Sequence, residues 1–294
     1  MSWSDLWGYE FMRYALLSAL ILGPTCALLG VFVTLRGMAF FSDALAHSAI
    51  TGVALGLLLQ ERTGLDLDPM WFVFIFSVAL ALIMAWMNRH SSLAPDTVIS
   101  FSFTGSVALG VVIISWLGKY RLLDSILFGS IYANDLNDVI RQAILSLIVI
   151  GFLVSQMRGF ALSTLSPELA HVQQLPSRLL HYLFAVLVAA TVALSLKMLG
   201  ALLLSALIVI PAATAKLVGG SFRSLLLIAV SIGLLVPPSG VWASAQLNLP
   251  TGPAIVLGNV LLLFTCYVGK SLHRISMNNS GKRSELKHGL RSGR

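Results

Sequence analysis

Residues 12–35 read MRYALLSALILGPTCALLGVFVTL, a run in which Arg13 is the one charged side chain. An α-helix needs about 20 mostly apolar residues to cross the hydrocarbon core of a bilayer. The run is therefore long enough and apolar enough to span a membrane. Similar windows recur along the chain, and we expect spans at 12–35, 43–60, 70–88, 97–118, 138–157, 179–198, 201–218, 224–243 and 253–269.

The composition of the whole chain agrees with this pattern. Of its 294 residues, 57% are hydrophobic and 11% are charged, whereas soluble domains are about 25% charged. We expect an all-α polytopic membrane protein, a bundle of eight or nine transmembrane helices, with residues 1–269 as its single domain. Residues 270–294 carry seven basic side chains against one acid, Glu285, and are predicted to be a disordered tail near anionic lipid, without a nucleic-acid role.

Several spans contain residues that break helices. Pro24 and Gly30 interrupt the first span, Pro211 the seventh, and Pro237 and Pro238 the eighth. Each proline removes a backbone donor and frees a carbonyl that needs another partner. The sequence therefore predicts broken helices around a cavity lined by protein.

The distribution of basic residues predicts the orientation. With nine spans and an external N-terminus, the basic tail falls on the cytoplasmic side together with Arg36, Arg89, Arg158, Arg178, Lys216 and Arg223. This arrangement obeys the positive-inside rule, so we expect a cytoplasmic C-terminus. The external segment 124–137 is too short and mixed to span, and is either a cap or a re-entrant segment.

Asp43 and His47 are the ionisable residues that stand out within the apolar spans. Such residues are costly in a membrane, which makes each a functional hypothesis. Their i, i+4 spacing puts both side chains on one helix face, about 6 Å apart. Carboxylate and imidazole suit zinc, manganese or iron(II), and suit copper(I) poorly. Two ligands make a weak metal site unless water or a second subunit completes it, and a transported ion must be able to leave.

Other interpretations of the pair stay open at this point. The two side chains could simply neutralise each other through a hydrogen bond, or relay protons. An enzyme is not expected, because no H-E-x-x-H, G-x-S-x-G or phosphate-loop motif is present. Lys197 is predicted to be an interfacial anchor. The remaining histidines are predicted to be surface residues, namely His90, His171, His181, His273 and His288.

Several motifs in order resemble a known family. They include LGVFV at 29–33, SDALAHS at 42–48, SPELA at 166–170, IPAATA at 210–215 and PTGP at 250–253. Together they cover residues 11–269 and strongly resemble the permeases of zinc and manganese ABC importers. In two places the chain departs from many relatives: Ser42 stands where they have glycine, and no glycine follows the SPELA segment at 173–175.

The resemblance implies an architecture and a set of partners. A permease homodimer would bind two cytoplasmic ATPase subunits and receive its ion from an extracellular or periplasmic solute-binding protein. The family's D-x-x-x-H motif maps to Asp43 and His47, in the translocation pathway. The family's ATPase-coupling loop maps to Ser166, Pro167, Glu168, Leu169 and Ala170, where the Ser-Pro-Glu order also predicts a short helix.

The sequence thus predicts the permease subunit of an ATP-driven importer in a prokaryotic plasma (inner) membrane. The expected cargo is zinc, with manganese next, moved by alternating access, and no permanently bound cofactor is expected. A secondary metal transporter or channel that works without ATPase partners is the alternative in another class. A siderophore or cobalamin permease is the alternative among ABC importers, and the Asp–His pair and the shorter chain argue against it.

Overall fold

The computed structural model describes residues 10–64, 68–119, 127, 129, 135–247 and 249–292. Throughout these residues the secondary structure is helical, and nine helical segments are long and apolar enough to cross a membrane. The all-α fold predicted from the sequence is confirmed, with nine spans rather than eight. The helices are α2 (Glu10–Leu35), α3 (Ala39–Thr63), α4 (Pro69–His90), α5 (Pro95–Leu117), α7 (Leu136–Ser155), α8 (Met157–Leu165), α9 (Pro167–Val172), α10 (Ser177–Val218), α11 (Phe222–Leu247) and α12 (Thr251–Ser292).

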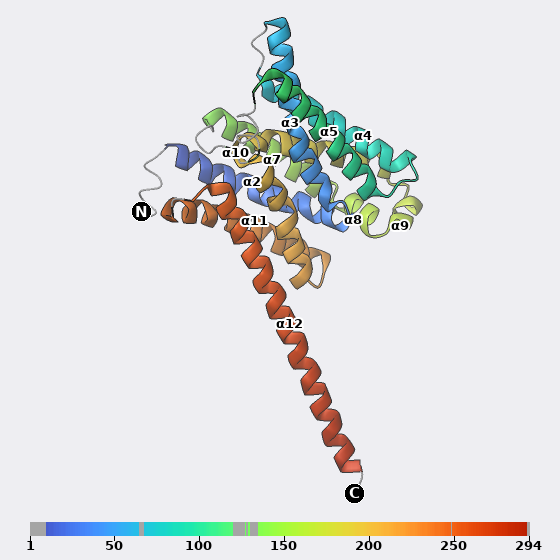
Figure 1. The fold of residues 1–294 in the computed structure, drawn as a ribbon. Coiled ribbons are helices and arrows are strands. Elements are labelled where there is room, and N and C mark those ends of the chain that lie inside the picture. The colour runs from blue at the N-terminus through green and yellow to red at the C-terminus, as the bar shows by residue number, and fades with distance from the viewer. Residues whose placement is uncertain are drawn as a thin grey trace.

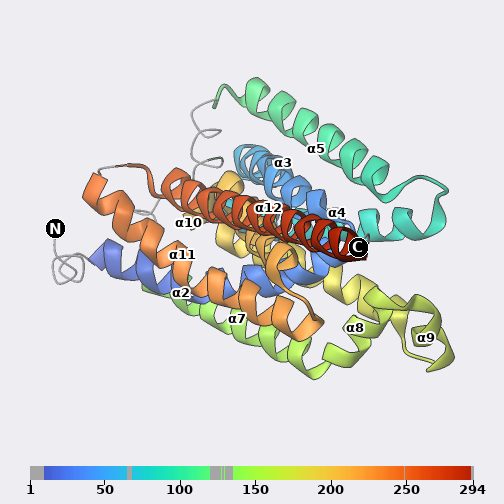
Figure 2. The same ribbon diagram turned by 90° about the horizontal axis from the view of Figure 1, so that it is seen from below.

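Helix α10 lies in the middle of the bundle. It packs against α2, α11 and α12 as well as against α3 and α4, while α3 also packs along α5. Figure 2 shows α2, α7 and α11 on one side of the bundle and α3 and α5 on the other. Helices α8 and α9 lie at one end of the bundle, opposite the end where α2 begins (Figure 2).

The break in the helical path falls at Gly200, not at the prolines. Pro24, Pro237 and Pro238 lie inside continuous helices, whereas Gly200 has φ 70° and ψ 164° and divides α10 into the spans Ser177–Lys197 and Leu199–Val218. The prediction of helices broken at proline is therefore wrong. Proline fixes φ near the helical value and removes one donor, so a helix supported by its neighbours can continue through it.

Helix α12 extends well beyond the membrane span. Its apolar part ends at Leu272, but the helix continues to Ser292 and projects away from the bundle (Figure 1). The helix therefore continues past residue 269, after which the sequence predicts a disordered tail, and the disorder of that tail stays a prediction. Where the transmembrane domain ends and the tail begins stays a prediction.

The starts of α4 and α7 are fixed by acidic caps. The Asp68 side chain accepts a hydrogen bond from the Met70 backbone N–H at 3.0 Å, and Asp135 and Asp138 form a capping box at the start of α7. The Asp138 N–H, which donates to the Asp135 carboxylate at 2.9 Å, holds the pKa of Asp135 below its usual value. Most of the segment 124–137, predicted as a cap or re-entrant segment, lies outside the described residues.

Close helix packing around α2 depends on residues without a side chain. A β-carbon on Gly30 would overlap the carbonyl oxygen of Ile208 in α10, and one on Gly23 would overlap that of Gly233 in α11. Small residues let helix backbones approach closely in membranes, where van der Waals packing drives helix association. The two glycines therefore set the distance of α2 from α10 and α11.

We predict that Gly30→Ala destabilises the protein by about 1–3 kcal/mol, because the new methyl group must push α2 away from the backbone of α10. Gly151→Ala in α7 is the matched control, since a β-carbon there meets no atom within 4 Å. The melting temperature of the detergent-purified protein should fall for the first variant and hold or rise for the second. Equal melting temperatures for the two variants would contradict this account of the α2 contact.

Candidate functional site

Asp43 and His47 lie in the second and third turns of α3, and the structure brings their side chains together. Asp43 Oδ1 lies 3.5 Å from His47 Nε2, and the side chains are 38% and 19% exposed, respectively. The i, i+4 spacing predicted this shared face from sequence. The pair is neither sealed in the core nor fully open, so its outer side can still accept a ligand.

Two further helices contribute to the surroundings of the pair. The ring of Phe103 in α5 meets the His47 imidazole edge to face, with centroids 5.7 Å apart. From the second span of α10, Ser205 lies near the Asp43 carboxylate, and its hydroxyl donates to the Leu202 carbonyl at 3.2 Å. Sequence reasoning missed both residues, because neither belongs to a motif and each is distant in sequence.

Polar residues beside the pair are satisfied within their own helix. The Ser48 hydroxyl donates to the Leu45 carbonyl at 2.8 Å, and that of Ser42 to the Ala39 carbonyl at 3.4 Å. Ser42 is fully buried in this position. These hydroxyls leave the Asp43 carboxylate to its contacts with His47 and Ser205.

The position of α5 beside the pair is fixed one turn further along α3. The Thr51 hydroxyl donates to the Ser106 carbonyl oxygen, and a β-carbon on Gly110 would lie 2.6 Å from Thr51 Oγ1. Helices α3 and α5 are therefore in backbone contact here. This contact holds Phe103 against His47.

One chain places one carboxylate and one imidazole at this site. Among the described residues, no group of three or more His, Cys, Asp and Glu side chains is arranged to hold a metal ion. A carboxylate and an imidazole suit a borderline divalent cation. Further ligands would have to come from water or from a second copy of the chain.

The segment 166–170 forms the start of a short helix, as its Ser-Pro-Glu order predicted. Ser166 precedes α9, which runs from Pro167 to Val172. Ala170 is buried, whereas the Leu169 side chain is 54% exposed and that of Val172 is 79% exposed. Exposed apolar side chains on a one-and-a-half-turn helix form a surface that a partner protein can cover.

Arg36 joins α8, which precedes this short helix, to the loop before α3. Its Nε donates to Thr164 Oγ1 at 3.1 Å and its Nη2 to Ser163 Oγ at 3.4 Å. The guanidinium also lies over the rings of Phe184 and Phe160, at 4.6 and 5.4 Å from their centroids. Burial lowers the pKa of Arg36 to about 10, so the group stays charged at neutral pH.

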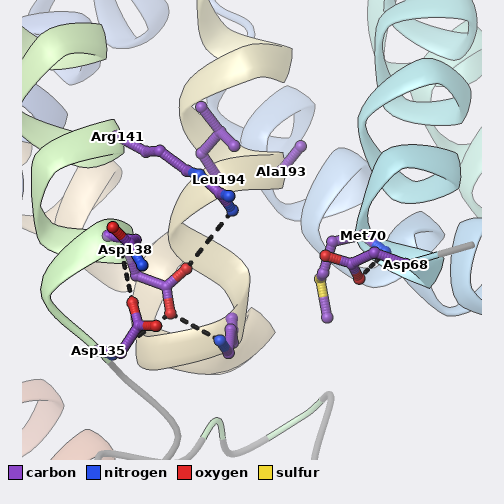
Figure 3. A pocket seen from close by; sticks show the side chains of 9 residues that line it. Asp68, Met70, Asp135, Asp138, Arg141, Ala193 and Leu194 are labelled. Atoms are coloured by element: carbon purple, nitrogen blue, oxygen red, sulfur yellow. Dashed lines mark hydrogen bonds and ion pairs between the residues drawn. The ribbon is translucent and has the colours of Figure 1, made fainter.

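A second polar cluster lies at the opposite end of the bundle (Figure 3). It lines a cavity of about 360 Å³ and includes Asp68, Asp135 and Arg141. Lys197 Nζ donates to Asp138 Oδ2 at 2.6 Å. Lys197 was predicted to be an interfacial anchor. The structure shows that it pairs across 59 positions of sequence, which no local pattern could reveal.

Comparison with known proteins places this geometry in a family. The model of the ABC 3 transport family matches residues 8–270. The chain belongs to the ABC 3 transport family. It is 33% identical to the high-affinity zinc uptake system membrane protein ZnuB of Haemophilus influenzae, covering 86% of this chain and 95% of that protein.

The chain is also similar to a second protein with a metal-transport name and to a solved structure. It is 29% identical to the manganese transport system membrane protein MntC of Listeria monocytogenes, over 88% of this chain and 91% of the relative. The solved structure of PsaBC from Streptococcus pneumoniae in complex with Fab superposes with a TM-score of 0.77 at 25% identity, covering 90% of this chain and 93% of that one. The family resemblance inferred from the sequence motifs is thereby confirmed.

The turn after α9 contains a residue, Gln174, in a strained backbone conformation. Gln174 has φ 52°, a left-handed conformation that costs a residue with a side chain about 1–2 kcal/mol. We predict that Gln174→Gly raises the melting temperature of the purified protein. Gln173→Gly is the matched control, because Gln173 has φ −80° and glycine there gains nothing. A lower melting temperature for Gln174→Gly than for Gln173→Gly would refute the assignment of strain to this turn.

Proposed function

We propose that this chain is the membrane-spanning permease subunit of an ABC importer for a divalent transition-metal ion, with zinc the first candidate and manganese the second. The observation that carries the proposal is the half-exposed Asp43–His47 pair, with 3.5 Å between its ligand atoms, in a chain of the ABC 3 transport family. The names of the zinc and manganese relatives support the choice of cargo. ATP would be hydrolysed by separate subunits.

The pair would bind the ion briefly during transport rather than hold it permanently. Two protein ligands bind a divalent ion weakly, and weak binding allows the ion to leave again. In a homodimer the pairs of both protomers would face one pathway and supply four ligands. The 38% exposure of Asp43 in the single chain supports this arrangement, since its carboxylate is open on one side.

The transport cycle would be alternating access driven by the ATPase subunits. A solute-binding protein would deliver the ion at the end of the bundle where α2 begins, and the ATPase subunits would grip α9 at the other end. Arg36 would transmit a movement of α9 from α8 to α2, because its side chain binds Thr164 of α8. Phe32, four residues earlier on α2, also packs on α8, with its ring centroid 5.6 Å from that of Phe160. Asp43 follows seven positions later on α3.

The proposed orientation places α8 and α9 in the cytoplasm of a prokaryotic cell. The ends of α2 and α4 carry Arg36 and Arg89, and α8 carries Arg158. Basic loop residues prefer the cytoplasmic side. This orientation puts the C-terminus of α12 in the cytoplasm and the cavity around Lys197 on the external side.

We predict that Asp43→Asn and His47→Ala each reduce metal uptake at least tenfold, because each removes one of the two ligands that a protomer offers. Uptake is measured in proteoliposomes that hold the full importer, with zinc, manganese and iron(II) in competition. Asp96→Asn and His90→Ala are the matched controls, since both residues are exposed and neither lies on α3.

Unchanged uptake by both variants, with the complex assembled, would remove the pair from the pathway. Uptake that continues without ATPase subunits would favour a secondary transporter or channel. The ion that competes best identifies the cargo.

A second prediction concerns the ATPase-coupling segment, Ser166 to Ala170. Leu169→Ser should lower the amount of ATPase subunit that copurifies with the permease several-fold, because it removes an exposed apolar contact from α9. Leu179→Ser is the matched control, since Leu179 is 57% exposed and Leu169 is 54% exposed, but Leu179 lies on α10. Equal copurification of ATPase subunits with both variants would exclude Leu169 from the contact.

A further inference from the structure

A second cavity, of about 430 Å³, opens at the end of the bundle that holds α8. It lies where α2 and α4 end and where α5 and α10 begin, and three basic side chains line it: Arg36, Arg89 and His181. Both arginines lie near enough to His181 to disfavour its charged form, so the three groups share one small volume in which the two guanidiniums carry the positive charge. We refer to it as the basic cavity.

The other polar groups of the basic cavity also favour an anion. Three hydroxyl side chains line it, those of Ser163, Thr164 and Ser177, together with the amide of Asn88, and no acidic residue is among its lining residues. Asp96, the acid nearest in sequence to this wall, is exposed in the first turn of α5. The start of α10 at Ser177 has no side-chain cap, and the positive end of a helix dipole favours negative charge.

Arg36 has hydrogen-bonding capacity to spare. Its Nε and Nη2 bind Thr164 and Ser163, but its Nη1 is buried without a hydrogen-bond partner in the part of the chain that the structure describes. A buried guanidinium nitrogen without a partner is costly. An anion in the cavity would supply the missing acceptor.

The flank of the cavity has features of the membrane–water interface. Trp86 is 55% exposed and stacks on His90 in the last turn of α4, with ring centroids 5.1 Å apart. Leu93, in the turn before α5, is 48% exposed. Tryptophan is enriched at the level of lipid headgroups, and basic pockets between transmembrane helices on the cytoplasmic side bind phosphate headgroups.

We propose that the basic cavity binds the phosphate headgroup of an anionic phospholipid. The headgroup phosphate lies between Arg36, Arg89 and His181, while the acyl chains run along the exposed apolar side chains of Trp86 and Leu93. A free phosphate would satisfy the same basic groups but would leave these apolar side chains without a contact. The location on the inner leaflet follows from the orientation proposed above, whereas the binding itself does not depend on it.

The test measures lipid binding to the purified permease in complex with its ATPase subunits. Titration with phosphatidylglycerol, phosphatidylcholine or inorganic phosphate is followed by the melting temperature, and bound lipid is counted by native mass spectrometry. The variants are Arg89→Gln and His181→Gln. The matched control is Arg223→Gln, an exposed arginine on α11 that does not line the cavity. Arg36 is left intact because it also holds α8.

Phosphatidylglycerol should stabilise the wild type and Arg223→Gln alike, and its apparent affinity should fall about tenfold in Arg89→Gln, as expected for the loss of one charge-assisted hydrogen bond. Phosphatidylcholine should have no such effect. If inorganic phosphate stabilises the protein as well as phosphatidylglycerol does, and the cavity variants lose that effect, the cavity is a phosphate site but its source is not lipid.

Equal lipid binding by all variants would overturn the proposal. Loss of copurified ATPase subunits in Arg89→Gln without any change in lipid binding would also overturn it, in favour of a protein partner. Because binding is measured on the purified complex without metal, failure here leaves the uptake experiments on Asp43 and His47 unaffected.

Discussion

The contact of α2 with α10 and α11 is the constraint on which the rest of the bundle depends. In hydrocarbon there is no water to bind backbone groups, so each span must be helical and must gain its stability from packing. Gly23 and Gly30 let the backbone of α2 touch those of its two neighbours. Helix α10 in turn carries Ser205 to the carboxylate of Asp43. A shift of α2 would therefore disturb both the helix packing and the polar surroundings of the candidate site.

The same region joins the candidate site on α3 to the helices α8 and α9 in one rigid unit. Phe32 near the end of α2 packs against Phe160, Phe184 and Phe222, with ring centroids 5.6 to 6.3 Å apart. Aromatic pairs at such distances are favourable beyond the area they bury. Arg36, one turn later, adds cation–π contacts and two hydrogen bonds to α8. The end of α2 is thus attached firmly to the helix that leads to α9, while its other side leads directly into α3.

The sequence predicted the features that depend on residues close together along the chain and missed those that join distant residues. The spans follow from apolar windows, the Asp43–His47 contact from an i, i+4 spacing, and α9 from its Ser-Pro-Glu start, because each depends on neighbouring residues. Other features join residues from separate helices, so no local sequence pattern predicts them. They are the Lys197–Asp138 pair, the approach of Phe103 and Ser205 to the site, and the basic cavity. The breaks expected at Pro24, Pro237 and Pro238 were wrong because tertiary packing supports a helix that local chemistry would interrupt. Gly200, where the path does break, lies between the spans expected at 179–198 and 201–218, so the apolar windows did predict this boundary.

The exposure of the Asp43–His47 pair supports the functional interpretation proposed above over a purely structural one. A pair kept only to neutralise two buried polar groups is best enclosed, because an ion pair or hydrogen bond gains strength as water is removed. Here the carboxylate stays 38% exposed although the residues around it, such as Ser42, Leu45 and Ala46, are almost fully buried. The helix therefore leaves its costliest side chain partly exposed instead of enclosing it in the core. An intramembrane carboxylate that faces outward in this way is stabilised only if water, an ion or a second protomer meets it, and a transport pathway provides all three.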